Sequence, residues 1–274
     1  MTLNSKLKQL KQYLKNLEIV VVAFSSGVDS TFLLKIAHDT LNEKAVAVTA
    51  KSCSFPNREL AEAAKFCELN NIKHIIFDFD VFNVKGFKDN PQNRCYLCKK
   101  ELFSKIRSIA KENEITNIIE GSNLDDEVDY RPGMKAVKEL NIKSPLRELG
   151  FTKDEIRKLS KELGLPTFEK PSFACLASRF VYGETITKEK IKMVDMAEQL
   201  LLDLGFHQVR VRIHSDIARI EVEPNEMQKI MDNRNTITHK LKELGFSYVT
   251  LDLLGYRTGS MNERINIKNN SKLF

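Results

Sequence analysis

The sequence predicts an α/β protein, with a parallel-sheet domain over residues 1–150 and a smaller α+β domain over residues 151–274. Two patterns predict this division. In the first part, apolar strand-like runs alternate with segments of helical periodicity, as in right-handed βαβ units. In the second part, two segments of alternating apolar and polar residues flank a short polar turn, as in a β-hairpin.

The first part contains four predicted strands and four predicted helices. Its first strand is a continuous apolar and β-branched run, which is typical of a buried strand in a parallel sheet. The strands are Ile19–Phe24, Ala45–Ala50, Lys73–Phe77 and Asn117–Glu120. The helices are residues 6–17, 29–41, 57–70 and 97–113. Strands separated by helices of this length favour a Rossmann-like parallel sheet.

The second part opens with a helix that begins in a capping box, Thr152–Glu155, and ends at Gly164. An irregular stretch follows over residues 167–187. The remaining predicted elements, in order, are a helix over 188–204, strands Gln208–Ile213 and Ile217–Val222, a helical stretch over 224–243 and a strand Ser247–Leu251. We expect these strands to form an antiparallel sheet.

Composition restricts the class of protein. Hydrophobic residues make up 42% of the chain, enough for a folded core, and the net charge of +6 suits either a nucleotide or RNA. No apolar run reaches the roughly 18 residues that cross a bilayer, and the charged N-terminus lacks the apolar core of a secretory signal. We therefore expect a cytoplasmic protein with no membrane association. In that reducing compartment, five cysteines, an odd number, argue against a disulfide framework. Cys67, inside a predicted helix, is interpreted as a buried filler.

A serine-rich loop, Ser25-Ser26-Gly27-Val28-Asp29-Ser30, joins the first strand to the helix after it. Ligands of parallel sheets bind at this place, where backbone N–H groups, hydroxyls and the helix dipole can hold phosphates. A magnesium ion would reconcile Asp29 with phosphate, because Mg²⁺ takes carboxylate and phosphate oxygens together. The alternative is that Asp29 or Ser30 only caps the helix. A Gly-x-x-x-x-Gly-Lys motif is absent from the loop.

This loop resembles the PP-loop of the ATP pyrophosphatases, which usually reads Ser-Gly-Gly-x-Asp-Ser. The resemblance implies an adenine nucleotide α-hydrolase-like fold and cleavage of ATP between its α and β phosphates, which yields an adenylate and pyrophosphate. It also implies that Ser25, Ser26, Gly27, Asp29 and Ser30 bind ATP and Mg²⁺, with Asp29 taking part in catalysis. One departure is that Ser26 occupies the position of the first glycine.

Two cysteines form a Cys-x-x-Cys motif, Cys95-Tyr96-Leu97-Cys98, and Cys175 lies far from them in a Ser- and Pro-rich stretch. Three thiolates suit an iron–sulfur cluster with one open iron. A redox pair or half of a zinc site remains open, although a second Cys-x-x-Cys is absent from the sequence. The basic neighbours Arg94, Lys99 and Lys100 favour thiolates.

Four further segments carry a more specific resemblance. They are Gly121–Gly133, Ala174–Phe180, Val209–Arg212 and Ile217–Glu221. Over about residues 8–262 the chain resembles the LarE family, the sulfur transferases that help build the nickel-pincer cofactor of lactate racemase. The resemblance implies that ATP adenylates a carboxylate of a pyridinium-3,5-dicarboxylate mononucleotide and that sulfur then replaces AMP.

The family also implies roles for the cysteines. Members with three cysteines at the positions of Cys95, Cys98 and Cys175 are understood to hold a 4Fe–4S cluster that carries an extra sulfide. In other members the cysteine matching Cys175 gives up its own sulfur and becomes dehydroalanine. Because this chain has the three-cysteine pattern, we favour the cluster, with Cys175 as catalytic residue.

Three arginines, Arg179, Arg210 and Arg212, match the family positions proposed to grip the substrate phosphate. An arginine fork binds phosphate at two points, and alternation puts Arg210 and Arg212 on one strand face. The alternative is a solvated strand face whose arginines pair with carboxylates such as Glu221. Ser52 and Gly121 complete the expected nucleotide-binding set.

Four other positions remain open. Glu127 and Asp129 could bind magnesium or pair with Arg131, and we keep Glu127 as the magnesium candidate. His214 could be a base, but a turn residue is favoured. Arg257, which matches a family segment, could contact phosphate or another subunit.

We expect a small-molecule nucleotide substrate, a homo-oligomer like the family's closed rings, and no nucleic-acid partner. Two rival functions remain. One is an iron–sulfur-dependent tRNA thiolase of the same loop class, although no zinc ribbon is visible in the sequence. The other is a nucleotide-binding regulator without turnover, which the serine at position 26 would favour.

Overall fold

The computed structural model describes residues 2–127, 132–171 and 173–262. Within it the chain divides into two compact units. The first comprises Met1–Lys85 and Asn93–Phe173, and the second comprises Gly86–Gln92 and Ala174–Phe274. The boundary predicted from the sequence was residue 150 instead. The difference arises because Phe151, Ile156 and Leu165 are buried in the core of the first unit.

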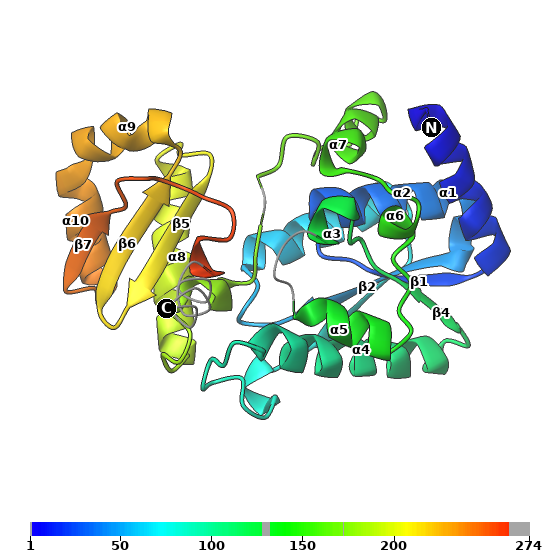
Figure 1. Cartoon of the computed structure of the whole chain (residues 1–274), viewed down its shortest axis with the longest axis horizontal. Helices are drawn as coiled ribbons and strands as arrows, with labels where there is room; N and C mark the ends of the chain where they lie inside the picture. Colours follow the sequence, from blue (N-terminus) through cyan, green and yellow to red (C-terminus); the bar gives the residue numbers. More distant parts are fainter. Residues whose placement is uncertain (1, 128–131, 172, 263–274) are drawn as a thin grey trace, which may run out of the picture. The chain divides into compact units, whose positions relative to one another are not determined.

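The first unit contains a four-stranded parallel sheet, as the sequence predicts (Figure 1). Its strands are β1 (Val20–Ala23), β2 (Ala45–Lys51), β3 (His74–Asp78) and β4 (Asn117–Ile119). They lie in the order β3-β2-β1-β4, and every pairing is parallel. The chain therefore leaves β1 toward one edge through β2 and β3 and later returns to its other side with β4. This reversal makes the carboxyl ends of β1 and β4 the switch point where ligands bind such sheets.

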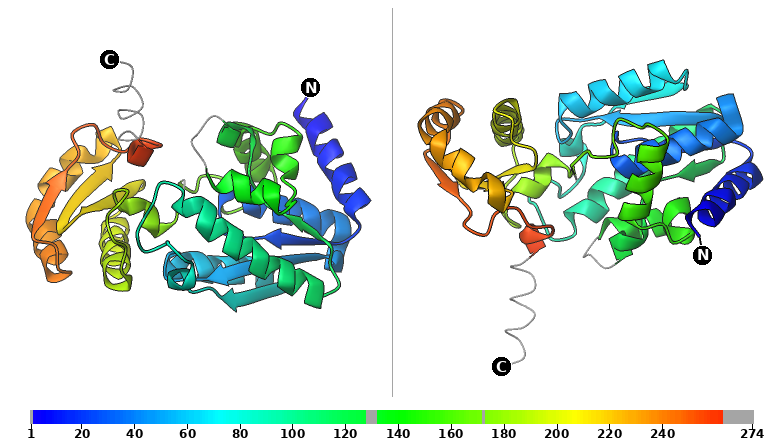
Figure 2. Two further views of the ribbon diagram at one scale, coloured as in Figure 1. Left: turned by 60° about the horizontal axis from the view of Figure 1, so that its bottom comes forward. Right: turned by 90° about the horizontal axis from the view of Figure 1, so that it is seen from above.

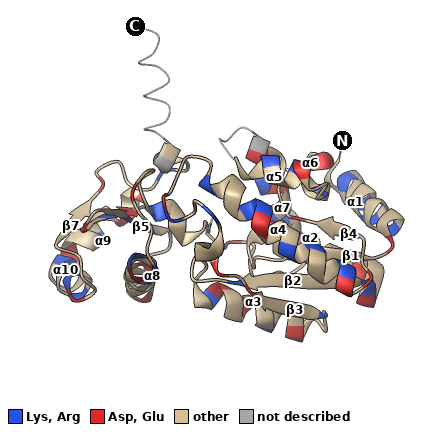
Figure 3. Cartoon of the chain, turned by 90° about the horizontal axis from the view of Figure 1, so that it is seen from below, with Lys and Arg blue, Asp and Glu red and all other residues tan. Residues whose placement is uncertain are grey.

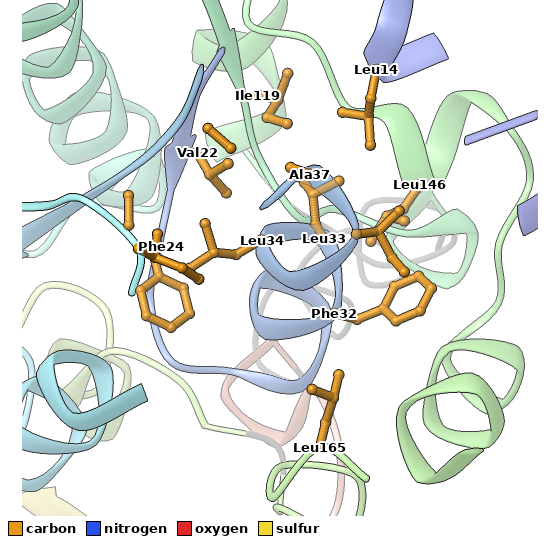
Figure 4. Close-up of a cluster of buried hydrophobic side chains, with 14 of the residues drawn as sticks. Leu14, Val22, Phe24, Phe32, Leu33, Leu34, Ala37, Ile119, Leu146 and Leu165 are labelled. Carbon is orange, nitrogen blue, oxygen red and sulfur yellow. The ribbon is translucent and has the colours of Figure 1, made fainter. Parts of the chain in front are cut away.

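Helices cover both faces of this sheet (Figure 1). They are α1 (Leu3–Leu17), α2 (Val28–Leu41), α3 (Asn57–Leu69), α4 (Arg94–Glu112), α5 (Gly133–Glu139), α6 (Pro145–Glu148) and α7 (Lys153–Glu162). Successive side chains of β1 point to opposite faces of the sheet. Val20 and Val22 pack in the core with α1, α2 and α7, and Val21 packs in the core with α4 and α5. Figure 4 shows Phe32, Leu33 and other apolar side chains gathered around α2, which fixes the helix that follows the loop.

Two expectations for the helices of the first unit are confirmed. Thr152 and Glu155 form the expected capping box at the start of α7. Cys67 lies within α3 and is buried in the core, and burial raises the pKa of its thiol to about 12. Within the described part of the chain, no helix is both long and apolar enough to cross a membrane. Figure 3 shows acidic and basic residues interspersed along α4.

The second unit is a small α+β unit whose sheet has the order β5-β6-β7. Its described elements are α8 (Lys188–Asp203), β5 (Val209–His214), β6 (Ile217–Val222), α9 (Met227–Asp232), α10 (Arg234–Glu243) and β7 (Tyr248–Leu251). Strands β5 and β6 are antiparallel, but β6 and β7 are parallel, so the expectation of an all-antiparallel sheet is wrong. The reason is the helical connection through α9 and α10, which returns the chain to the end where β6 began. Figure 2 shows α8 and α10 beside this sheet.

A short excursion of the chain, Gly86–Gln92, belongs to the second unit although it lies within the sequence of the first. The Asn90 side chain donates to the carbonyl of Val181 at 2.6 Å, and the Asn90 carbonyl accepts from Gly183 N–H at 2.9 Å. Ile186 N–H donates to the Lys88 carbonyl at 2.8 Å. The segment is thereby paired along its backbone with residues 181–186.

Candidate active site

The loop after β1 leads directly into α2. Gly27 is the N-cap residue, and α2 begins at Val28 with no side-chain cap hydrogen bond. Asp29 and Ser30 therefore lie within the first helical turn, and the alternative that either one caps the helix is wrong. Since the first N–H groups of a helix have no intrahelical acceptor, this uncapped turn can bind an anion.

The serines close the loop on itself. Ser25 Oγ and Ser30 Oγ lie 3.1 Å apart, and the Ser30 hydroxyl donates to the Gly27 carbonyl at 3.2 Å. Ser26 is buried and has a φ of 58°, in the left-handed region that glycine adopts most easily. The serine at the family's glycine position thus keeps a glycine-like backbone.

Gly121, at the end of β4, approaches this loop closely. A Cβ atom at Gly121 would lie 2.9 Å from Ser30 N and 3.1 Å from Ser30 Cα. Only glycine lets β4 end against the first turn of α2 at this distance. The structure therefore brings two of the sequence-predicted elements, the loop and Gly121, together at the switch point.

Asp29 presents one paired and one orphaned oxygen. Its Oδ2 is ion-paired with Lys153 Nζ, while Oδ1 is buried and accepts no hydrogen bond from the described residues. The Lys153 backbone N–H is itself fixed by Asp125 Oδ2 at 2.7 Å. An orphaned carboxylate oxygen beside an anion-binding turn fits a magnesium ligand, because Mg²⁺ prefers oxygen and shares it with phosphate.

Ser52 lies just after β2, at the same edge of the sheet as the loop. Its hydroxyl lies 3.2 Å from Ser54 Oγ. No described hydrogen bond joins Ser52 to the loop after β1. The Glu127 side chain, Asp129 and Arg131 lie outside the described residues.

A buried carboxylate next to Gly121 was not predicted from the sequence. Glu120 accepts hydrogen bonds from Ser122 Oγ at 2.7 Å and from Ser144 Oγ at 2.5 Å. These bonds tie the residues after β4 to Ser144 at the start of α6. A glutamate that ends an apolar strand directly before Gly-Ser was the available signal.

The three candidate cluster ligands are divided between the units. Cys95 and Cys98 stand one turn apart at the start of α4 in the first unit, and buried Arg94 donates to Cys95 Sγ at 3.7 Å. Cys175 precedes a short 3₁₀ helix, Leu176–Arg179, in the second unit. Across the described residues, no group of three or more His, Cys, Asp or Glu side chains is placed to hold a metal. The chemistry of three thiols still fits a cluster, since soft thiolate is its usual ligand.

The candidate arginines of the second unit gather with two buried carboxylates. Arg179 binds Glu198 at two points, with Nε 2.7 Å from Oε1 and Nη2 2.8 Å from Oε2. Arg212 binds Glu221 in the same way at 3.1 and 3.0 Å. The strand face is therefore buried rather than solvated, although the expected pairing with Glu221 is present at Arg212. Glu198, which projects from α8, was not predicted from the sequence.

Arg210 completes this cluster. It lies opposite Glu221 in the strand register, and its guanidinium is 5.2 Å from the centre of the Tyr256 ring. Burial, reinforced by the charge of Arg179, lowers the pKa of Arg210 to about 10. The side chain thus stays protonated at neutral pH, and three buried guanidinium groups meet two buried carboxylates.

Two remaining candidates have local roles in the structure. Arg257 donates to Asp252 Oδ1 at 3.2 Å and to the Gly255 carbonyl at 2.9 Å. His214 is the last residue of β5 and pairs with Ile217, so the turn itself is Ser215-Asp216. The turn predicted to include His214 therefore begins one residue later, at Ser215.

The parallel sheet, the uncapped serine-rich loop and the aspartate at the switch point define a PP-loop protein with an adenine nucleotide α-hydrolase-like fold. No family model matches the chain. A pyridinium-3,5-bisthiocarboxylic acid mononucleotide synthase of Lactiplantibacillus plantarum is 39% identical over 265 residues, which cover 96% of each chain. The chain belongs to the family of this synthase, the LarE family.

Two other relatives place the chain more broadly. An uncharacterized protein of Synechocystis is 42% identical over 95% of this chain and 98% of its own length. A subunit of the glutamine-hydrolyzing GMP synthase from Thermoplasma volcanium is 26% identical over 64% of this chain and 60% of its own length. The chain is accordingly an ATP-dependent sulfur transferase of the PP-loop class.

Proposed function

We propose that this chain uses ATP to insert sulfur into a pyridinium dicarboxylate mononucleotide. The observation that carries the proposal is 39% identity over nearly the whole chain with a relative whose name states a bisthiocarboxylic mononucleotide product. The orphaned Asp29 oxygen beside an uncapped loop supports the use of ATP with magnesium. The parallel-sheet unit would bind ATP, and the second unit would bind the phosphate of the pyridinium mononucleotide.

The loop would act on the leaving group. A carboxylate is a poor electrophile, and attack of its oxygen on the α phosphorus forms an acyl-adenylate and releases pyrophosphate. The N–H groups of the first turn of α2 would hold the negative charge that develops on the pyrophosphate. Asp29 would hold Mg²⁺, which would neutralise phosphate charge when bound.

The arginine cluster would hold the mononucleotide phosphate. Three protonated guanidinium groups against two carboxylates leave an excess of positive charge in a buried setting. Arg179 and Arg212 each bind a carboxylate at two points. If either one contacted the phosphate, it would lose one of its hydrogen bonds to that carboxylate. We assign the contact with phosphate to Arg179, Arg210 and Arg212 together, with the Arg210 guanidinium lying over the Tyr256 ring.

The sulfur would come from a 4Fe–4S cluster held by Cys95, Cys98 and Cys175. Bound, such a cluster would supply a deprotonated sulfur nucleophile. The buried guanidinium of Arg94, which donates to Cys95 Sγ at 3.7 Å, would orient that ligand. We also propose that the chain forms a homo-oligomer, which sedimentation velocity would detect as a species heavier than its 31.4 kDa monomer.

The test is anaerobic purification, followed by iron and sulfide analysis and by mass spectrometry of Cys175 before and after turnover. About four irons per chain with Cys175 intact supports the cluster. An iron-free, active chain whose Cys175 loses about 34 Da, the mass of hydrogen sulfide, contradicts the cluster and favours sacrifice of Cys175. Replacement Cys95→Ser should remove the iron, and Cys67→Ala, which changes a core cysteine, is the matched control.

The substrate is tested separately by pyrophosphate release. Release that depends on the dicarboxylate mononucleotide supports the proposal. Release that depends instead on tRNA would contradict it and favour the thiolase, and no release with either substrate would favour the regulator without turnover.

A further inference from the structure

Lys170 contacts the backbone of the phosphate loop from a distant part of the sequence. Its Nζ lies 3.0 Å from the Ser26 carbonyl oxygen, 2.6 Å from Glu59 Oε2 and 2.5 Å from Glu62 Oε2. An ammonium group has three N–H donors, and these three acceptors use all of them. Lys170 is thus satisfied by protein atoms, so a direct bond to phosphate would require it to leave one of them.

The position of Lys170 is itself fixed. The Arg157 guanidinium donates to the Phe168 carbonyl at 2.5 Å and to the Lys170 carbonyl at 2.8 Å. Glu59 and Glu62 belong to α3, where a spacing of three residues puts them on one face. The side chains of Lys170 and Glu59 are only 15% and 9% exposed, so water competes little for their contacts.

The contact determines which way a phosphate-binding donor points. In a trans peptide, the carbonyl of one residue and the N–H of the next point in opposite directions. Holding the Ser26 carbonyl toward Lys170 therefore holds the Gly27 N–H away from Lys170. It also maintains the left-handed backbone of Ser26, a conformation that a serine adopts at a cost.

We propose that Lys170 is a positioning residue of the nucleotide site. It holds the Ser26–Gly27 peptide in the orientation that presents the Gly27 N–H to the ATP phosphates, and it does so where the loop lacks the usual glycine. The inference rests on the proposed use of ATP. It assigns no contact between Lys170 and the nucleotide.

The test measures binding of α,β-methylene-ATP with Mg²⁺ by isothermal titration calorimetry, because this analogue cannot be cleaved between its α and β phosphates. Lys170→Met should raise the Kd about tenfold, equivalent to about 1.4 kcal/mol. Ser26→Gly in the same chain should recover much of that loss, since glycine adopts the left-handed backbone without support. The loss caused by Lys170→Met should therefore be smaller with Ser26→Gly than without it.

Lys35→Met is the matched control, because Lys35 forms a 2.6 Å ion pair with Asp39 on α2, within the same helix. It should leave the Kd unchanged. Circular dichroism checks folding, and if Lys170→Met does not fold, Lys170→Gln, which also removes the charge, takes its place with the same requirement for rescue. Unchanged affinity in a folded Lys170 variant would overturn this inference but not the proposed function. An equal loss of affinity with and without Ser26→Gly would do the same. Absence of analogue binding by the unmodified protein would overturn the proposed function, and the inference with it.

Discussion

Arg179 and Glu198 form a buried ion pair in the second unit, with side chains that are 0% and 2% exposed. The same guanidinium donates through Nη1 to the Ala174 carbonyl at 3.0 Å, and Glu198 also accepts the Val211 N–H at 2.9 Å. One pair therefore joins α8, β5 and the backbone that leads to Cys175.

Replacing one partner of this pair should destabilise the protein strongly. In Glu198→Gln, the charge of Arg179 stays buried without its carboxylate, and the free energy of unfolding should fall by about 3–5 kcal/mol. Urea denaturation measures the loss. Glu243→Gln is the control, because Glu243 pairs with Lys240 on an exposed surface, and it should leave the urea midpoint nearly unchanged. Equal losses in the two variants would contradict the structural role assigned to Glu198.

The same carboxylate should make stability depend on acid. Burial alone would raise the pKa of Glu198, but the charge and hydrogen bonds of Arg179 outweigh it, so the pKa lies below its usual value. The unfolded chain then binds this proton more readily than the folded protein does. The pair's contribution is complete above about pH 4.3 and is lost as pH falls through the folded pKa. Between about pH 5 and about pH 3, the urea midpoint should fall less steeply in Glu198→Gln than in the unmodified protein.

A methyl group at Gly121 should weaken nucleotide binding. The added Cβ would meet backbone atoms of Ser30, which cannot rotate away as a side chain would. Gly121→Ala should therefore separate β4 from the first turn of α2, lower stability by about 1–3 kcal/mol and raise the Kd for ATP. Gly133→Ala is the control, since the atoms nearest to its Cβ would belong to the flexible Lys99 side chain, with Cδ 2.7 Å away. Calorimetry that finds wild-type affinity in Gly121→Ala would contradict the close approach as a requirement for binding.

Asp29 should account for the magnesium dependence of ATP binding. In Asp29→Asn the buried orphaned oxygen loses its charge, so Mg²⁺ should no longer improve ATP affinity in calorimetric titrations with and without the metal. Asp39→Asn removes a carboxylate farther along the same helix, where Asp39 pairs with Lys35, and it should retain the full magnesium effect. A magnesium effect that persists undiminished in Asp29→Asn would place the ion elsewhere.

The parallel sheet and its loop could be predicted because their signals are local. The β-branched run before Ser25 identifies a buried strand, and the next helix must then begin at the ligand-binding edge. The capping box at Thr152 is similarly complete within four residues. In each case the residues that make the contact are neighbours in sequence.

The remainder depends on contacts between distant residues. Lys170 reaches Ser26 across 144 positions, and nothing in the sequence around either residue indicates the other. The amphipathic face of α7 predicts burial but does not specify which core buries it, so the sequence does not indicate that the compact first unit continues past residue 150. The parallel pairing of β7 with β6 could have been predicted from the sequence, because the helical stretch before β7 is the kind of crossover that parallel strands require.

The excursion at Gly86–Gln92 means that the chain passes between the two units three times, after residues 85, 92 and 173. A protease cut at residue 173 would therefore not release the second unit whole, since the partners of Val181, Gly183 and Ile186 would remain on the other fragment. The two fragments of a chain split there should need each other for reassembly. A chimera that takes its second unit from a relative should therefore fold only if the seven residues from Gly86 to Gln92 come from the same relative.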